Sequence, residues 1–203
     1  MKSLSEIETV SKRASRAAGY SWGICEEVGK NIRLLEMFGL PGIKNLNDYF
    51  DKKKKQKFEN LKLINAENKS TKFQYCPIIS GTSLLDQIKS LNNLNEIKFE
   101  GIAYPLLFLP FVSRASEIIG KRLLLKLDSN EFLLNFNNNI FSNFINNEII
   151  IIANIVTIQL LENTDSFSEK EWNQLYKLSE ETFVEESDSL KETAAGAGLT
   201  DND

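Results

Sequence analysis

The sequence predicts a domain of the α+β or α/β class, in which an antiparallel sheet from the second half of the chain is covered by N-terminal helices. Apolar residues recur at helical spacing up to residue 50, at every second position over residues 122–136, and as a β-branched run at residues 149–158. We expect one globular domain over residues 1–188, with a polar loop or linker near 51–72, followed by an acidic C-terminal tail over residues 189–203.

The first expected helix begins after Ser3 or Ser5, because each serine is followed three residues later by a glutamate, as a capping box requires. The helix ends at Gly19, where a residue without a side chain can close it. Its apolar stripe consists of Leu4, Ile7, Val10, Ala14 and Ala17.

The second expected helix lies between Gly19 and Gly39, and its Gly29 would let a neighbouring helix approach closely. A short third helix follows the turn at residues 40–42, before the lysine-rich polar stretch. The expected core positions of these two helices are Ile24, Val28, Ile32, Leu35, Ile43, Leu46, Tyr49 and Phe50.

Further along, residues 73–79 are expected to be extended and to lead through a glycine turn into a helix capped by Ser83. Pro110 suits the first turn of another helix, which Gly120 ends. A hairpin at residues 122–136 and one or two strands at residues 149–158 should then form the sheet. Ser168, with a glutamate three residues later, should cap a final helix.

The absence of histidine excludes the usual serine and cysteine triads and histidine zinc sites. Two cysteines, Cys25 and Cys76, are too few for a disulfide framework, so both are expected to be reduced thiols. Neither a signal-peptide leader nor an apolar run long enough to cross a bilayer is found, which predicts a cytoplasmic protein without membrane association.

Charge is distributed unevenly although the formal net charge is only −4. Residues 1–57 contain 12 basic and 7 acidic residues, whereas residues 162–203 contain 3 basic and 12 acidic residues. The two ends of the chain should attract one another. The acidic tail would oppose binding to a polyanion, which argues against nucleic acid as a partner.

Cys76 is the candidate catalytic residue, because a thiol close to a helix start can become a nucleophile, although a buried structural thiol fits the same pattern. We expect the tail to dock on the first two helices, within one chain or across a homodimer, and to border a pocket there. The candidate residues for binding a ligand or partner are Tyr20, Trp22, Glu26, Arg33, Gly196, Gly198, Asp201 and Asp203.

Several segments together resemble a bacterial family of proteins that is defined only as a domain of unknown function. The resemblance rests on Gly19-Tyr20-Ser21-Trp22-Gly23 with Glu26-Glu27-Val28-Gly29-Lys30, on Cys76-Pro77, on Ala103-Tyr104-Pro105-Leu106-Leu107 with Pro110-Phe111, and on Ala195-Gly196-Ala197-Gly198-Leu199-Thr200-Asp201-Asn202-Asp203. It implies kinship over nearly the whole chain and carries no activity with it.

Two hypotheses on function remain open. The first is a non-catalytic accessory protein that binds a small molecule or a protein partner, and the second is a small histidine-free enzyme that uses carboxylates or Cys76. The first is favoured because no nucleophile in the sequence has an identifiable base. No cofactor follows from the sequence. No metal site is assigned either, since the aspartates of the tail, which would suit magnesium or calcium, are more often solvated than coordinating.

Overall fold

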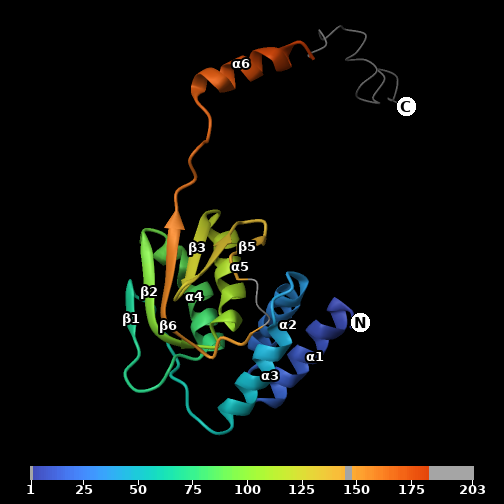
Figure 1. Ribbon diagram of the computed structural model, residues 1–203, viewed down its shortest axis with the longest axis vertical. Coiled ribbons are helices and arrows are strands. Elements are labelled where there is room, and N and C mark those ends of the chain that lie inside the picture. The colour runs from blue at the N-terminus through green and yellow to red at the C-terminus, as the bar shows by residue number, and fades with distance from the viewer. Residues whose placement is uncertain (1, 145–147, 183–203) are drawn as a thin grey trace, which may run out of the picture. The chain divides into compact units, whose positions relative to one another are not determined.

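The computed structural model describes residues 2–144 and 148–182, and the chain divides into two compact units, Met1–Asn163 and Thr164–Asp203 (Figure 1). The tail expected at residues 189–203 lies outside the described residues. The polar stretch near 51–72 contains the end of one helix and a three-residue strand, with turns and bends around them. Among the described residues, no helix is long and apolar enough to cross a membrane.

The first unit begins with three helices, α1 (Leu4–Ala17), α2 (Trp22–Met37) and α3 (Gly42–Lys53), which lie together in the blue and cyan part of Figure 1. Of the two serines that the sequence offers as caps, Ser3 caps α1 in a full capping box with Glu6. The helices α1 and α2 pack closely at Gly29, where a Cβ atom would lie 2.8 Å from the carbonyl oxygen of Glu8. The expected close approach at this glycine is therefore confirmed.

The buried face of α1 differs from the expected apolar stripe. Val10 is 64% exposed, and the side chains of α1 that are buried belong to Ser11 and Ser15. Glu8 and Lys12 lie nearest to Gly29 of α2, and Ser11 lines a cavity together with residues of α3, so the positions of two neighbouring helices rather than apolarity select the buried face.

One sheet contains the six strands of the described residues, in the order β1-β2-β6-β3-β4-β5. The pair β1 and β2 is parallel, and every other neighbouring pair is antiparallel. The strands are β1 (Glu67–Lys69), β2 (Glu96–Ala103), β3 (Arg122–Leu127), β4 (Asn130–Leu134), β5 (Ile140–Ser142) and β6 (Ile152–Leu161). The expected hairpin at residues 122–136 is confirmed, and β6 occupies the β-branched run.

The helices that lie against the sheet are α4 (Pro77–Leu91) and α5 (Leu109–Ile119), and α2 packs on both of them (Figure 1). A 3₁₀ helix, η1 (Pro105–Leu107), leads into α5, which has Pro110 in its first turn and ends at Gly120. The fold is therefore α+β, with a mostly antiparallel sheet, helices α4 and α5 against it, and α2 packed on these two helices.

The start of α4 corrects the prediction for residues 73–83. The helix begins at Pro77 rather than near Ser83, because Cys76 is its N-cap and the proline ring suits the first turn. Gly81 does not form a turn before the helix but lies within it. The ring of Phe111 on α5 occupies the space where a Cβ atom of Gly81 would stand. A close helix contact, which the local sequence does not reveal, explains this glycine.

The second unit contains α6 (Glu169–Glu180), described here by itself. Ser168 caps it in a capping box with Glu171, as predicted. The rings of Phe167 and Trp172 stack with their centroids 5.6 Å apart at its start.

The contact between Gly81 and Phe111 predicts that a methyl group added at position 81 destabilises the protein. Replacing Gly81 with alanine should lower the free energy of unfolding by about 1 to 3 kcal/mol through overpacking, although alanine favours helix. Gly23→Ala is the matched control, because nothing lies within 4 Å of its missing Cβ in α2. Urea unfolding measures both. Equal stability of Gly81→Ala and the native protein would contradict the close packing of α4 on α5.

Candidate functional site

A cavity of about 510 Å³ opens where the start of α2, the end of α3 and the start of α4 meet. Its buried floor consists of polar side chains, and its mouth consists of the loop that follows α3. The lining residues are Gly19, Tyr20, Ser21, Ile24, Tyr49, Lys53, Gln56, Lys57, Phe58, Asn60, Cys76 and Ile79. We call this space the tyrosine–cysteine cavity.

Tyr20, Tyr49 and Cys76 form a hydrogen-bonded cluster at the floor. The hydroxyl oxygens of Tyr20 and Tyr49 are 2.8 Å apart, and the hydroxyl of Tyr49 is 3.0 Å from the sulfur of Cys76. The hydroxyl of Tyr20 lies 3.7 Å from the same sulfur. All three side chains are at most 6% exposed. Three chain segments are thus joined through polar groups that water barely reaches.

Both phenols of the cluster remain protonated at neutral pH. Burial, and next the nearby thiol of Cys76, raise the pKa of Tyr49 and the pKa of Tyr20 far above the ordinary value. A phenol that keeps its proton is a hydrogen-bond donor and acceptor but not a base. The floor therefore consists of neutral hydrogen-bonding groups.

Two lysines give the mouth of the cavity a positive charge. The ammonium group of Lys53 lies 4.0 Å from the ring centroid of Tyr20 and donates to the carbonyl of Ala18 at 2.9 Å. Lys57 lines the exposed side. None of the described lining residues is acidic, and neither lysine forms a salt bridge with the part of the chain that the structure describes. The mouth favours an anion.

Glu59 fixes the rim of the cavity. Its carboxylate accepts hydrogen bonds from the backbone N–H groups of Thr71, Lys72 and Phe73 at 3.3, 2.7 and 3.0 Å. Its own carbonyl accepts from the N–H of Cys76 at 2.8 Å. These backbone donors lower the pKa of Glu59 from 4.5 to about 2. The loop at residues 71–73 is thereby tied to the segment that leads into Cys76 at the cavity floor.

The structure brings together two of the residues singled out in the sequence and separates the others from them. Tyr20 and Cys76 meet in the cavity, whereas Trp22, Glu26 and Arg33 do not line it. Gly196, Gly198, Asp201 and Asp203 lie outside the described residues.

The side chains of Trp22, Glu26 and Arg33 contact α1. The ring of Trp22 lies under two cations, Lys12 at 5.9 Å and Arg16 at 5.4 Å. Glu26 pairs with Lys12 at 2.7 Å, and Arg33 pairs with Glu8 at 3.1 Å. These contacts connect α1 to α2 across its exposed edges.

Sequence reasoning gave Tyr49 and Lys57 no functional role. Tyr49 was expected only as a core position, and Lys57 lay in a stretch expected to be a solvated face. The signal for Tyr49 was its hydroxyl, which needs a partner when the ring is buried. Nothing local marked Lys57, because its place at the mouth depends on the fold of the loop after α3.

Cys25 differs from Cys76 in its surroundings. Cys25 is fully buried, burial raises its pKa, and it is not among the residues that line the cavity. Both cysteines are free thiols. Within the described ranges, no group of three or more potential metal-ligating side chains is present.

The fold and the cavity define an α+β protein with a preformed polar pocket beside its N-terminal helices. Residues 2–75 match the sequence model of a family described as "Protein of unknown function (DUF3726)", which confirms the resemblance to an uncharacterised family over that span. The matched span supplies every lining residue of the cavity except Cys76 and Ile79. No curated protein and no solved structure matches the chain.

The hydrogen bonds of Glu59 predict a pH-dependent rim. Because the folded pKa is lowered to about 2 from 4.5, the stabilisation by this carboxylate is present above pH 4.5 and is lost as the pH falls through about 2. Amide protection at residues 71–73, measured by NMR, should therefore persist at pH 4 and fall towards pH 2.

In Glu59→Gln the same amides should lose protection at neutral pH. The control Glu67→Gln should not show this loss, because the carboxylate of Glu67 pairs with Lys69 at 4.0 Å and accepts no hydrogen bond from the backbone of residues 71–73. Native-like protection at residues 71–73 in Glu59→Gln would contradict the role of this carboxylate.

Proposed function

We propose that the protein is a non-catalytic binding protein, and that the tyrosine–cysteine cavity holds a small anionic molecule. The observation that carries this proposal is the polarity of the cavity, with neutral donors at the floor, two lysines at the mouth and no acidic residue in the described lining. Its volume of about 510 Å³ is in the range of small-molecule sites.

Charge and hydrogen bonding suggest how such a molecule would lie. An anionic group at the mouth would meet Lys53 and Lys57, whose charges no salt bridge neutralises among the described residues. A hydroxyl or carbonyl group at the inner end would reach the phenols of Tyr20 and Tyr49, which can both donate and accept. The binding energy would then come from a few placed polar contacts rather than from apolar area.

Binding is favoured over catalysis because the cavity contains a nucleophile without a base. Cys76 is the candidate nucleophile, and its polar neighbours are the phenol of Tyr49 at 3.0 Å, the backbone N–H of Ile79 at 3.4 Å and the phenol of Tyr20 at 3.7 Å, none of which is a base. A thiol usually needs an adjacent base or another group that stabilises the thiolate before it attacks. Its contacts instead suit a structural thiol that caps α4.

Protection of Cys76 from iodoacetamide tests the proposal without a known ligand. The protein is incubated with the small-molecule fraction of an extract of its own cells, separated by anion exchange into bound and unbound pools. The bound pool should slow alkylation of Cys76 severalfold, and the unbound pool should not. Cys25 is the internal control, since it does not line the cavity.

Two lysine variants locate the effect. Lys57→Met should abolish the protection, whereas Lys55→Met should leave it intact, because Lys55 lies in the same lysine-rich stretch but does not line the cavity. The proposal fails if neither pool protects Cys76, or if the unbound pool protects it equally well.

A further inference from the structure

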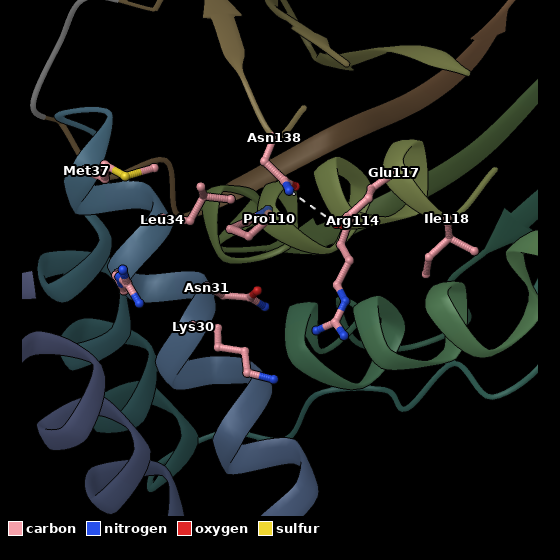
Figure 2. A pocket seen from close by; sticks show the side chains of 10 residues that line it. Lys30, Asn31, Leu34, Met37, Pro110, Arg114, Glu117, Ile118 and Asn138 are labelled. Carbon is pink, nitrogen blue, oxygen red and sulfur yellow. Dashed lines mark hydrogen bonds between the residues drawn. The ribbon is translucent and has the colours of Figure 1, made fainter. Parts of the chain in front are cut away.

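A second cavity, of about 730 Å³, lies between α2 and α5 and shares no lining residue with the tyrosine–cysteine cavity (Figure 2). We call it the α2–α5 groove. It combines an apolar wall with charged groups. Its lining residues are Lys30, Asn31, Arg33, Leu34, Met37, Pro110, Arg114, Glu117, Ile118 and Asn138.

Asn31 is the unusual residue of the groove. Its side chain extends from α2 into the space between the two helices, as Figure 2 shows, and it is only 7% exposed. Its Nδ2 atom is buried and has no hydrogen-bond partner among the residues that the structure describes. A buried donor without a partner costs about 1 to 3 kcal/mol, so an apolar residue here would make the free protein more stable. A ligand that accepts a hydrogen bond would remove this cost.

Two cationic side chains lie at the end of the groove that contains Asn31. Arg114 extends from α5 and Lys30 from α2 into this space (Figure 2), and both pair with the same carboxylate, Glu27 of α2. One carboxylate between two cations leaves a surplus positive charge, and a guanidinium group has donors beyond those of a single ion pair. Arg33 is paired with Glu8 at 3.1 Å.

The other end of the groove is neutral to acidic. Glu117 accepts a hydrogen bond from Asn138 at 3.2 Å, which is the contact drawn in Figure 2. Between the two ends, the wall is apolar and consists of Leu34, Met37, Pro110 and Ile118. The groove therefore has one anion-accepting end and an apolar length.

We propose that the α2–α5 groove binds an organic oxyanion with an apolar body, whose oxyanion accepts hydrogen bonds from Asn31 and Arg114. The apolar body lies along Leu34, Met37 and Pro110. This ligand differs from the polar anion proposed for the tyrosine–cysteine cavity, because that cavity has a polar floor and the groove has an apolar wall.

Fluorescence titration with the aromatic sulfonate 1-anilinonaphthalene-8-sulfonate tests the proposal on the full chain. Asn31→Leu and Arg114→Met should each weaken binding about ten- to hundredfold, the loss expected for one charge-assisted hydrogen bond. Arg122→Met is the matched control, because Arg122 lies on β3 and does not line the groove. Lys30→Met, at an exposed position, serves as a further variant if Arg114→Met fails to fold.

Competition identifies the chemistry of the ligand. Octanoate should displace the probe, while octanol, octylamine and inorganic phosphate should not. Displacement by octanol equal to that by octanoate would overturn the role of the oxyanion, and displacement by inorganic phosphate would overturn the role of the apolar wall. Unchanged affinity in Asn31→Leu and in both charge variants would overturn the site itself.

Thermal unfolding separates a binding role of Asn31 from a structural one. Since its Nδ2 donor has no partner in the described part of the chain, Asn31→Leu should melt at the same temperature as the native protein or higher while losing the probe. A lower melting temperature together with unchanged probe affinity would show that Asn31 serves the fold alone.

Discussion

The hydroxyl group of Tyr49 connects three segments of the chain through hydrogen bonds, and the arrangement of the N-terminal helices depends on this connection. The ring is fully buried, and the hydroxyl contacts both Tyr20, before α2, and Cys76, the N-cap of α4. Polar groups removed from water are costly unless they are paired, so these contacts must form together. Three segments that are distant in the sequence are thereby held in one arrangement.

Aromatic packing around Tyr49 extends this constraint towards the sheet. Its ring contacts the rings of Phe50, Phe58 and Tyr104, with centroids 5.2 to 5.7 Å apart. Tyr104 follows β2 and has a positive φ of 45°, which is unfavourable for a residue with a side chain. Its hydroxyl donates to Asp48 at 2.6 Å. The strained backbone is held by contacts from α3, so the helices and the sheet depend on one another here.

Helix α2 borders two different chemical environments at different turns along its length. Its N-terminal end closes a polar cavity with a basic mouth, and its middle turns lie along an apolar groove with one cationic end. Gly29 of α2 packs against α1, and ion pairs between the two helices flank this contact. A rigid helix with a fixed neighbour can hold preformed sites, because little ordering remains to be done when a ligand binds.

Features that depend on neighbouring residues could be predicted from the sequence. The capping boxes at Ser3 and Ser168, the hairpin and the helix start at Pro110 all follow from local patterns. The start of α4 could not be predicted, since Gly81 is explained by the ring of Phe111 from another helix. The sequence also did not show that Ser11 and Ser15 rather than Val10 are buried, because the packed face of α1 depends on where the neighbouring helices lie.

The candidate site was predictable in part. Tyr20 and Cys76 stood out individually, but their meeting through Tyr49 depends on tertiary contacts across 56 positions of sequence. Asn31 has no local signal at all, because an asparagine on a helix is ordinary until its surroundings are known to be buried.

A crystal structure of the protein, purified from its own cells without a denaturing step, tests the central claim most directly. The account predicts electron density for an ordered anionic molecule in the tyrosine–cysteine cavity, within hydrogen-bonding distance of Tyr20 or Tyr49 and with its charged group near Lys57. A cavity filled by the protein's own side chains, with the sulfur of Cys76 shielded from any ligand, would contradict it.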